Sequence, residues 1–187
     1  DPLIRSIVSQ MRGYTTTAIT GFGSESVYLT EFGVTTERDG SLTLDEDTFT
    51  TMFESDPDAF MAIVNSRVTT DSSLVTASVT GDSYTAGSYA LAIDSDGVVT
   101  LDDETLTEYS TNSYLVTSGD AIGLQIDLTS SGADTTIYMG RSLIDTLSDY
   151  AATILDSTGQ LEDKITTYND DLTDYDDSLD KLDLRIE

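Results

Sequence analysis

Carboxylates are the most numerous charged side chains in this sequence that could take part in catalysis or in metal binding. The 187 residues include 35 Asp and Glu against 8 Lys and Arg, for a formal net charge of −27, and they include no Cys, His or Trp. The chain therefore has no imidazole base and no thiolate nucleophile or metal ligand. Paired carboxylates of the kind that hydrolyse glycosides are the chemistry left open. Adjacent acids recur along the whole chain, so no pair stands out from a solvated acidic surface, and we expect no enzyme.

The stretch Thr35–Glu46 has acids at a spacing that resembles a calcium-binding EF-hand loop. The third, fifth, sixth and twelfth positions are Glu37, Asp39, Gly40 and Glu46. The first position, normally Asp, is Thr35, and no clear helix precedes the stretch. A simpler interpretation is a turn at Asp39-Gly40, a short strand at Ser41–Leu44 and a helix capped by Asp45. We therefore predict no metal or cofactor site, with weak cation binding somewhere on the acidic surface left open.

The acidity and the absence of other motifs also bear on partners and location. A strongly negative surface repels phosphate backbones, so we expect no nucleic-acid partner. No apolar run approaches the roughly 20 residues that a membrane-spanning helix needs, so we expect no membrane insertion. Gly-rich phosphate loops and the G-x-S-x-G nucleophile motif do not occur. An Asp- and Thr-rich, Cys-free composition is typical of work outside the cell without disulfides, and we expect the sequence to be part of a longer chain.

Three segments of different composition must position any site. Residues 1–65 hold all five Phe and predict a helical part with a short strand. Asp1-Pro2 fits the cap and first position of an opening helix that ends near Gly13. A helix after Asp45 and another begun by Asp56-Pro57 should follow. The inner face of the helix after Asp45 is expected to comprise Phe49, Met52 and Phe53.

Residues 66–140 predict an antiparallel β domain. Val, Ile, Thr and Tyr are frequent there, in short runs that show the period-two alternation of half-buried strands. Turn signals that contain Gly separate the runs, so we expect a small sandwich or barrel-like domain. The expected strands are Leu74–Val79, Ser88–Ile93, Val98–Leu101, Ser113–Val116, Ile122–Leu128 and Thr135–Met139.

Residues 141–187 predict a long helix. Apolar residues recur there with 3-4 spacing over about six heptads, more than the three or four that indicate a coiled coil. Thr158, beside Gly159, is the weak point at which we expect a kink or break. The predicted oligomer or helix-packing seam comprises Ile144, Leu147, Ile154, Leu161, Ile165, Tyr168, Leu172, Tyr175, Leu179 and Leu182.

This seam needs a partner helix. Tyr168 and Tyr175 at consecutive d positions are too bulky for a tight parallel dimer, so we expect antiparallel or mixed packing. The opening helix of residues 1–65 is available but too short to cover the seam, and the rest should face further chain or another subunit. The predicted fold class is therefore α+β. It combines a helical, coiled-coil-like leg, built from short N-terminal helices and the long C-terminal helix, with an antiparallel β domain inserted between them.

Several stretches of the chain resemble one protein family when they are taken in order. These stretches are Asp1–Arg12, Leu29–Thr36, Asp39–Glu46 and Ser55–Phe60, followed by Ser142–Leu147 and Ser157–Gly159 before the heptads. Their order resembles the C-terminal part of the filament cap proteins of the bacterial flagellum, the hook-associated protein 2 or FliD family. Residues 66–140 match less well, although Gly87–Ile93 is similar to β repeats of flagellins and cap proteins.

This resemblance implies a non-catalytic structural protein. Such proteins are exported through the flagellar channel, form an oligomeric ring at the filament tip, and promote the folding and assembly of flagellin. The implied partners are further copies of the chain, flagellin and other hook-associated proteins, with an export chaperone as a further candidate. The implied location is extracellular, at the tip of the flagellum.

Three alternatives stay open at this point. The chain could be another flagellar axial protein, either a flagellin or a hook–filament junction protein. It could be an extracellular adhesin or carbohydrate-binding module, in which Tyr84, Tyr89 or Tyr114 of the β domain contacts host or surface glycans and the long helix is a stalk. It could also be a calcium-stabilised extracellular domain, in which Glu46 is a ligand.

Overall fold

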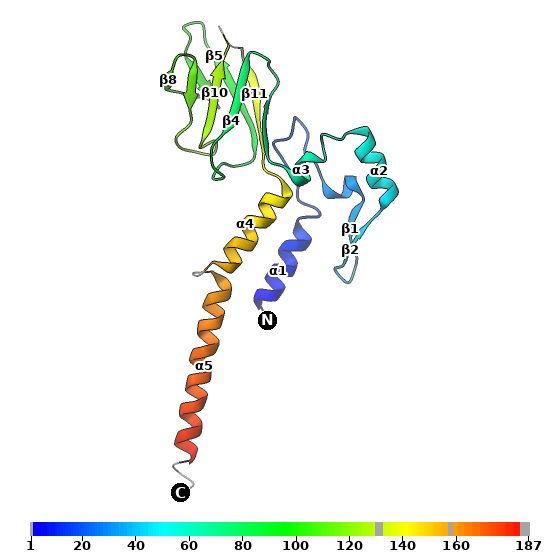
Figure 1. Ribbon diagram of the computed structural model, residues 1–187, viewed down its shortest axis with the longest axis vertical. Coiled ribbons are helices and arrows are strands. Elements are labelled where there is room, and N and C mark those ends of the chain that lie inside the picture. The colour runs from blue at the N-terminus through cyan, green and yellow to red at the C-terminus, as the bar shows by residue number, and fades with distance from the viewer. Residues whose placement is uncertain (1, 130–132, 157–158, 184–187) are drawn as a thin grey trace. The chain divides into compact units, whose positions relative to one another are not determined.

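The computed structural model describes residues 2–129, 133–156 and 159–183 (Figure 1). The fold is α+β, with antiparallel sheets and a long C-terminal helix, which confirms the predicted class. Contacts divide the chain into two compact units. One unit is Gln10–Thr146, and the other combines Asp1–Ser9 with Leu147–Glu187.

The larger unit contains a β-sandwich of two antiparallel sheets (Figure 1). One sheet has the strand order β3-β11-β5-β6-β7 and the other has the order β4-β10-β9-β8. The bounds of the strands are Arg67–Thr70 (β3), Val75–Val79 (β4), Gly87–Ile93 (β5), Val99–Leu101 (β6), Glu104–Thr105 (β7), Glu108–Ser110 (β8), Ser113–Leu115 (β9), Leu124–Leu128 (β10) and Thr135–Gly140 (β11).

The inner faces of both sheets supply one hydrophobic core. Alternate residues of β5 and β11 meet alternate residues of β10, because strand side chains point to opposite faces with a period of two. Leu124, Ile126, Ile137 and Met139 have no exposed surface. Full burial of each such side chain contributes about 1.5–3 kcal/mol, so this core stabilises the sandwich.

Turns separate the strands at the positions that the sequence predicted. Gly81, Gly97 and Gly119 have φ between 79° and 85°, which glycine adopts at little cost. The six strands predicted from alternation are present, shifted by no more than two residues at either end. Strands β3, β7 and β8 were not predicted, because Arg67–Thr70 lacks apolar alternation and the other two are short and acidic.

A smaller helical region of the same unit surrounds a cluster of Phe rings. It comprises the 3-10 helix η1 (Leu29–Phe32), strands β1 (Val34–Thr36) and β2 (Leu42–Leu44), and helices α2 (Glu46–Ser55) and α3 (Met61–Val64). Phe32 is fully buried and lies about 6 Å from both Phe49 and Phe60, measured between ring centroids. Phe53, although 42% exposed, stacks on Phe49. Of the inner face predicted for the helix after Asp45, Phe49 therefore packs against Phe32, and Phe53 packs against Phe49 and Phe60.

The two helix starts predicted in this region have different outcomes. The carboxylate of Asp45 accepts a hydrogen bond from the Thr48 amide at 2.9 Å, which confirms Asp45 as the cap of α2. The helix predicted to begin at Asp56-Pro57 starts later than predicted. Asp56 ends α2, and its carboxylate accepts the amide of Ala59 in a turn, so α3 begins only at Met61 and has four residues.

The segment between α1 (Pro2–Gly13) and η1 lies against the sandwich. Ile19 and Val27 form an antiparallel bridge, and the Thr20 hydroxyl donates to the carbonyl of Ala86 at 3.3 Å. Gly21 has φ +81°, and a Cβ added there would overlap the carbonyl group of Met139. Only glycine therefore allows the backbone to approach β11 this closely.

The remaining helices are α1 (Pro2–Gly13), α4 (Leu143–Leu155) and α5 (Gln160–Asp183). The opening helix is confirmed at its predicted end. The long helix predicted over 141–187 is divided near its expected kink or break, since α4 ends at Leu155 and α5 begins at Gln160. Its predicted weak point, Thr158, lies outside the described residues. Within the described residues, every helix is too short or too polar to cross a membrane.

Candidate functional site: an exposed apolar stripe on the C-terminal helices

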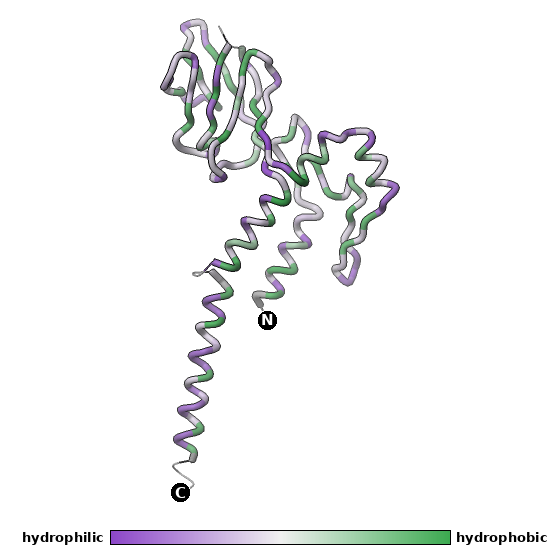
Figure 2. The backbone as a smooth tube through the Cα atoms, in the orientation of Figure 1, coloured by the Kyte–Doolittle hydropathy of each residue, from purple (hydrophilic) through white to green (hydrophobic). Residues whose placement is uncertain are grey.

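The ten predicted seam residues, here named the heptad stripe, lie on two helices. Ile144, Leu147 and Ile154 belong to α4, and the other seven belong to α5. On α5 they recur every three or four residues, which places them on one helix face. Figure 2 shows apolar residues recurring along α5 among hydrophilic ones.

The α5 part of the stripe is largely exposed. The exposed fraction is 61% for Leu172, 69% for Tyr175 and 59% for Leu179. On α4, Ile144 is exposed, whereas Leu147 and Ile154 are half-buried. Burying the exposed surface of one such leucine would contribute roughly 1–2 kcal/mol. An exposed apolar row along a single helix, as on α5, is a surface suited to packing against another helix.

Charges at its ends stabilise α5 itself. Glu162 and Asp163 lie in its first turn and Lys181 in its last, each favourable with the helix dipole. Lys164 places its ammonium 5.7 Å from the centre of the Tyr168 ring, one turn farther along.

A hydrogen-bonded cluster of three residues holds the first turn of α4. The fully buried Ser142 accepts the Asp145 amide at 3.1 Å and donates to the Asp145 carboxylate at 2.9 Å. Ser66, just before β3, donates to the same carboxylate oxygen at 2.5 Å and accepts the Ser142 amide at 2.8 Å. The hydrogen bonds from Ser66 and Ser142 lower the pKa of the Asp145 carboxyl.

This cluster was not predicted from the sequence. The spacing Ser142-x-x-Asp145 before an apolar run is a helix-start signal and could have indicated half of it. Ser66 precedes Asp145 by 79 residues, so no local pattern connects them. The cluster forms because β3 pairs with β11, which ends immediately before α4.

The three tyrosines that the adhesin alternative assigns to glycan contacts are buried, which contradicts that assignment. Tyr84, Tyr89 and Tyr114 are only 7–8% exposed and belong to the sandwich core. Burial raises the pKa of Tyr89 and of Tyr114. The Tyr84 hydroxyl donates to the Gly140 carbonyl at 3.1 Å. Rings held inside a core cannot stack on a sugar.

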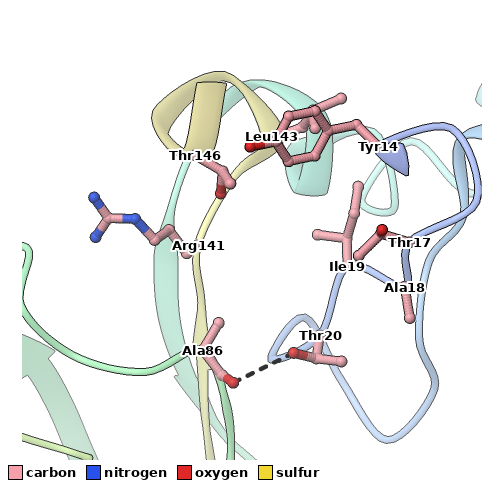
Figure 3. A pocket seen from close by; sticks show the side chains of 9 residues that line it. All are labelled: Tyr14, Thr17, Ala18, Ile19, Thr20, Ala86, Arg141, Leu143 and Thr146. Carbon is pink, nitrogen blue, oxygen red and sulfur yellow. Dashed lines mark hydrogen bonds between the residues drawn. The ribbon is translucent and has the colours of Figure 1, made fainter. Parts of the chain in front are cut away.

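The larger unit also has a small cavity, shown in Figure 3. Its volume is about 140 Å³, and its lining is mainly apolar and Thr side chains. The Arg141 guanidinium points away from it (Figure 3), donates to the Asp82 carbonyl at 2.6 Å and lies over the Tyr84 ring. The cavity residues are Tyr14, Thr17, Ala18, Ile19, Thr20, Ala86, Arg141, Leu143 and Thr146.

The EF-hand-like stretch forms a hairpin followed by a helix. Asp39 accepts the amide and hydroxyl of Ser41 in the turn between β1 and β2, and these bonds lower the pKa of its carboxyl. Asp45 caps α2, and the Thr48 amide bond lowers the pKa of that carboxyl. Among the described residues, no three acidic side chains converge on a point where they could hold a metal ion.

The described residues thus combine a β-sandwich with a long helix that carries an exposed apolar row on one face. A family model, the C-terminal part of flagellar hook-associated protein 2, matches residues 1–187. The chain therefore belongs to the flagellar hook-associated protein 2 family, in its C-terminal part. The family consists of structural proteins of the flagellar filament tip and is not known for catalysis. Comparison with curated proteins and with solved structures gave no significant match.

Proposed function

We propose that this chain is part of a flagellar filament cap that forms an oligomeric ring at the filament tip and promotes the folding and insertion of flagellin. The observation that carries the proposal is the heptad stripe. Seven apolar residues on one face of α5, from 39% to 69% exposed, are a costly surface for a protein that works alone. Packing within an oligomer would bury them, and membership of the family supplies the context.

The proposed organisation follows the three segments of the sequence. Residues 1–65 and 141–187 would form the leg, in which the heptad stripe packs in a coiled-coil-like arrangement. Residues 66–140 would be a β domain inserted into it. α1 has 12 residues and α5 has 24, so α1 is too short to cover the stripe alone, and other helices must contribute.

The proposed partners are further copies of the chain, flagellin and other hook-associated proteins, with an export chaperone before secretion. The exposed surface is rich in Ser, Thr and Asp, which suits contacts that must form and release during filament growth. The proposed location is extracellular, at the tip of the flagellum.

A gene deletion tests this proposal. Cells without the gene should secrete flagellin into the medium as monomer and should not swim, because arriving subunits are not retained at the tip. Restoring the full-length gene should return both filaments and swimming. Filaments of normal length and number in the deletion strain would contradict the proposal.

A further inference from the structure

We propose that the α5 part of the heptad stripe accepts a helix whose flanking positions are basic, and that it rejects a second copy of α5. This inference rests on the proposed role of the stripe as a packing surface and specifies the partner. It is carried by the charges that border the stripe.

The helix α5 is strongly acidic on its own. Residues 160–183 contain nine Asp and Glu against Lys164 and Lys181. In a pair of packed helices, the e and g positions border the apolar seam and contact the partner, so their charges decide which helices pair.

The border of the stripe is acidic or neutral apart from one lysine. With Ile165 and Leu172 at a positions and Tyr168 and Tyr175 at d positions, the e row over residues 162–178 is Glu162, Asn169 and Asp176. The g row over the same residues is Lys164, Asp171 and Ser178. Every one of these six is exposed except Lys164, which is partly buried with its ammonium over the Tyr168 ring.

Two copies of α5 would bring like charges together. In a parallel pair each g residue meets the e residue five positions on in the partner helix, so Asp171 faces Asp176 of the other copy twice. Lys164 faces Asn169 and gains no ion pair. In an antiparallel pair the e rows face each other, and a row without a base makes no opposite-charge pair in any register. The g rows then allow an opposite-charge contact between Lys164 of one copy and Asp171 of the other, formed twice, and each such contact would draw the ammonium away from its Tyr168 ring.

A helix with Lys or Arg at its flanking positions would form opposite-charge contacts with this border. Its cations would face Glu162, Asp171 and Asp176. The exposed Tyr175 ring also attracts Lys and Arg side chains. The stripe supplies the apolar contact, and the border selects the charge of the partner.

Reversing one border charge tests the rejection of a second copy. The Asp171→Lys variant would place a lysine opposite Asp176 twice in a parallel pair. Asp170→Lys makes the same charge change at the f position, away from the seam, and is the matched control. Sedimentation of the complete chain at low salt should show self-association strengthened on the order of tenfold in Asp171→Lys. Asp170→Lys should match the wild type. Equal self-association of the two variants would overturn the proposed rejection of a second α5.

Synthetic helices test the preference for basic flanks. Two peptides with the same Ile and Leu heptad core, one with Lys and one with Glu at all e and g positions, would be titrated into the complete chain. A third peptide with the composition of the Lys peptide but a scrambled order controls for simple charge attraction. The Lys peptide should bind at least tenfold more tightly than the other two and should lose affinity with added salt and in Leu172→Ser.

These outcomes distinguish the packing role of the stripe from its charge selectivity. Failure of all three peptides to bind through Leu172 would count against the stripe as a packing surface, and so against the proposed function. Equal binding of the Glu and Lys peptides would overturn only the charge selectivity.

Discussion

The hydrogen-bonded cluster of Ser66, Ser142 and Asp145 at the start of α4 should contribute measurably to the free energy of unfolding. Replacing Ser66 by Ala removes the hydrogen bond to the Asp145 carboxylate and leaves the buried amide of Ser142 without its acceptor. A hydrogen bond to a charged group contributes about 1.5–3 kcal/mol, and an unpaired buried amide costs about 1–3 kcal/mol. Because the carboxylate is partly exposed and water screens it, we expect a combined loss of about 2–3 kcal/mol in the free energy of unfolding.

The pH dependence of this loss is a second, independent signature. The pKa of the folded Asp145 lies below its ordinary value of 3.8, so the carboxylate stabilises the folded chain above that pH. Its contribution is lost as the pH falls through the lowered pKa. The difference between wild type and Ser66→Ala should therefore be full at neutral pH and should shrink in strong acid.

Urea unfolding at neutral pH and at about pH 2.5 measures both quantities. Ser118→Ala is the matched control, since Ser118 is an exposed loop residue. It should change the free energy of unfolding by less than about 0.5 kcal/mol. A Ser66→Ala variant as stable as this control, or one whose deficit is the same at both pH values, would refute the assignment.

Three further predictions use the same unfolding measurement. Gly21→Ala should cost about 2–4 kcal/mol because a Cβ there overlaps a backbone carbonyl, whereas Gly81→Ala, with a similar φ but open space, should cost about 1 kcal/mol. Leu124→Ala should lower the free energy of unfolding by about 2–5 kcal/mol, because Leu124 is fully buried. Leu172→Ala should lower it by less than about 0.5 kcal/mol, because Leu172 is 61% exposed. Equal losses would show that Leu172 packs within the chain. Calcium should change the melting temperature of wild type and Glu46→Gln equally, and a response lost in the variant would restore the calcium-loop interpretation.

The elements with regular local patterns could be predicted from the sequence. Alternation within Gly87–Ile93 and Leu124–Leu128 indicates strands, because a period of two reflects one buried face. The cap at Asp45 and the heptads of α5 are equally local. The four-residue strand Arg67–Thr70 carries no such pattern, and it becomes a strand through its pairing with β11.

The surroundings of individual side chains were harder to predict. Tyr114, on β9, and Tyr84, in the loop before β5, belong to a core that both sheets supply, and a strand pattern does not reveal that shared core. Ser66 and Asp145 meet through the same kind of long-range pairing. The heptad stripe was found from spacing alone, but its exposure on α5 is visible only in the structure.

The central proposal, that the heptad stripe is the packing surface of a filament cap, is tested most directly by counting filaments. A deletion strain would carry the full-length gene with either Leu172→Ser and Leu179→Ser, on the stripe, or Thr166→Ser and Thr173→Ser, exposed on α5 outside the stripe. We expect filaments to be lost in the first strain and retained in the second, with both proteins secreted in equal amounts. Normal filaments on cells that carry the stripe variant would contradict the proposal.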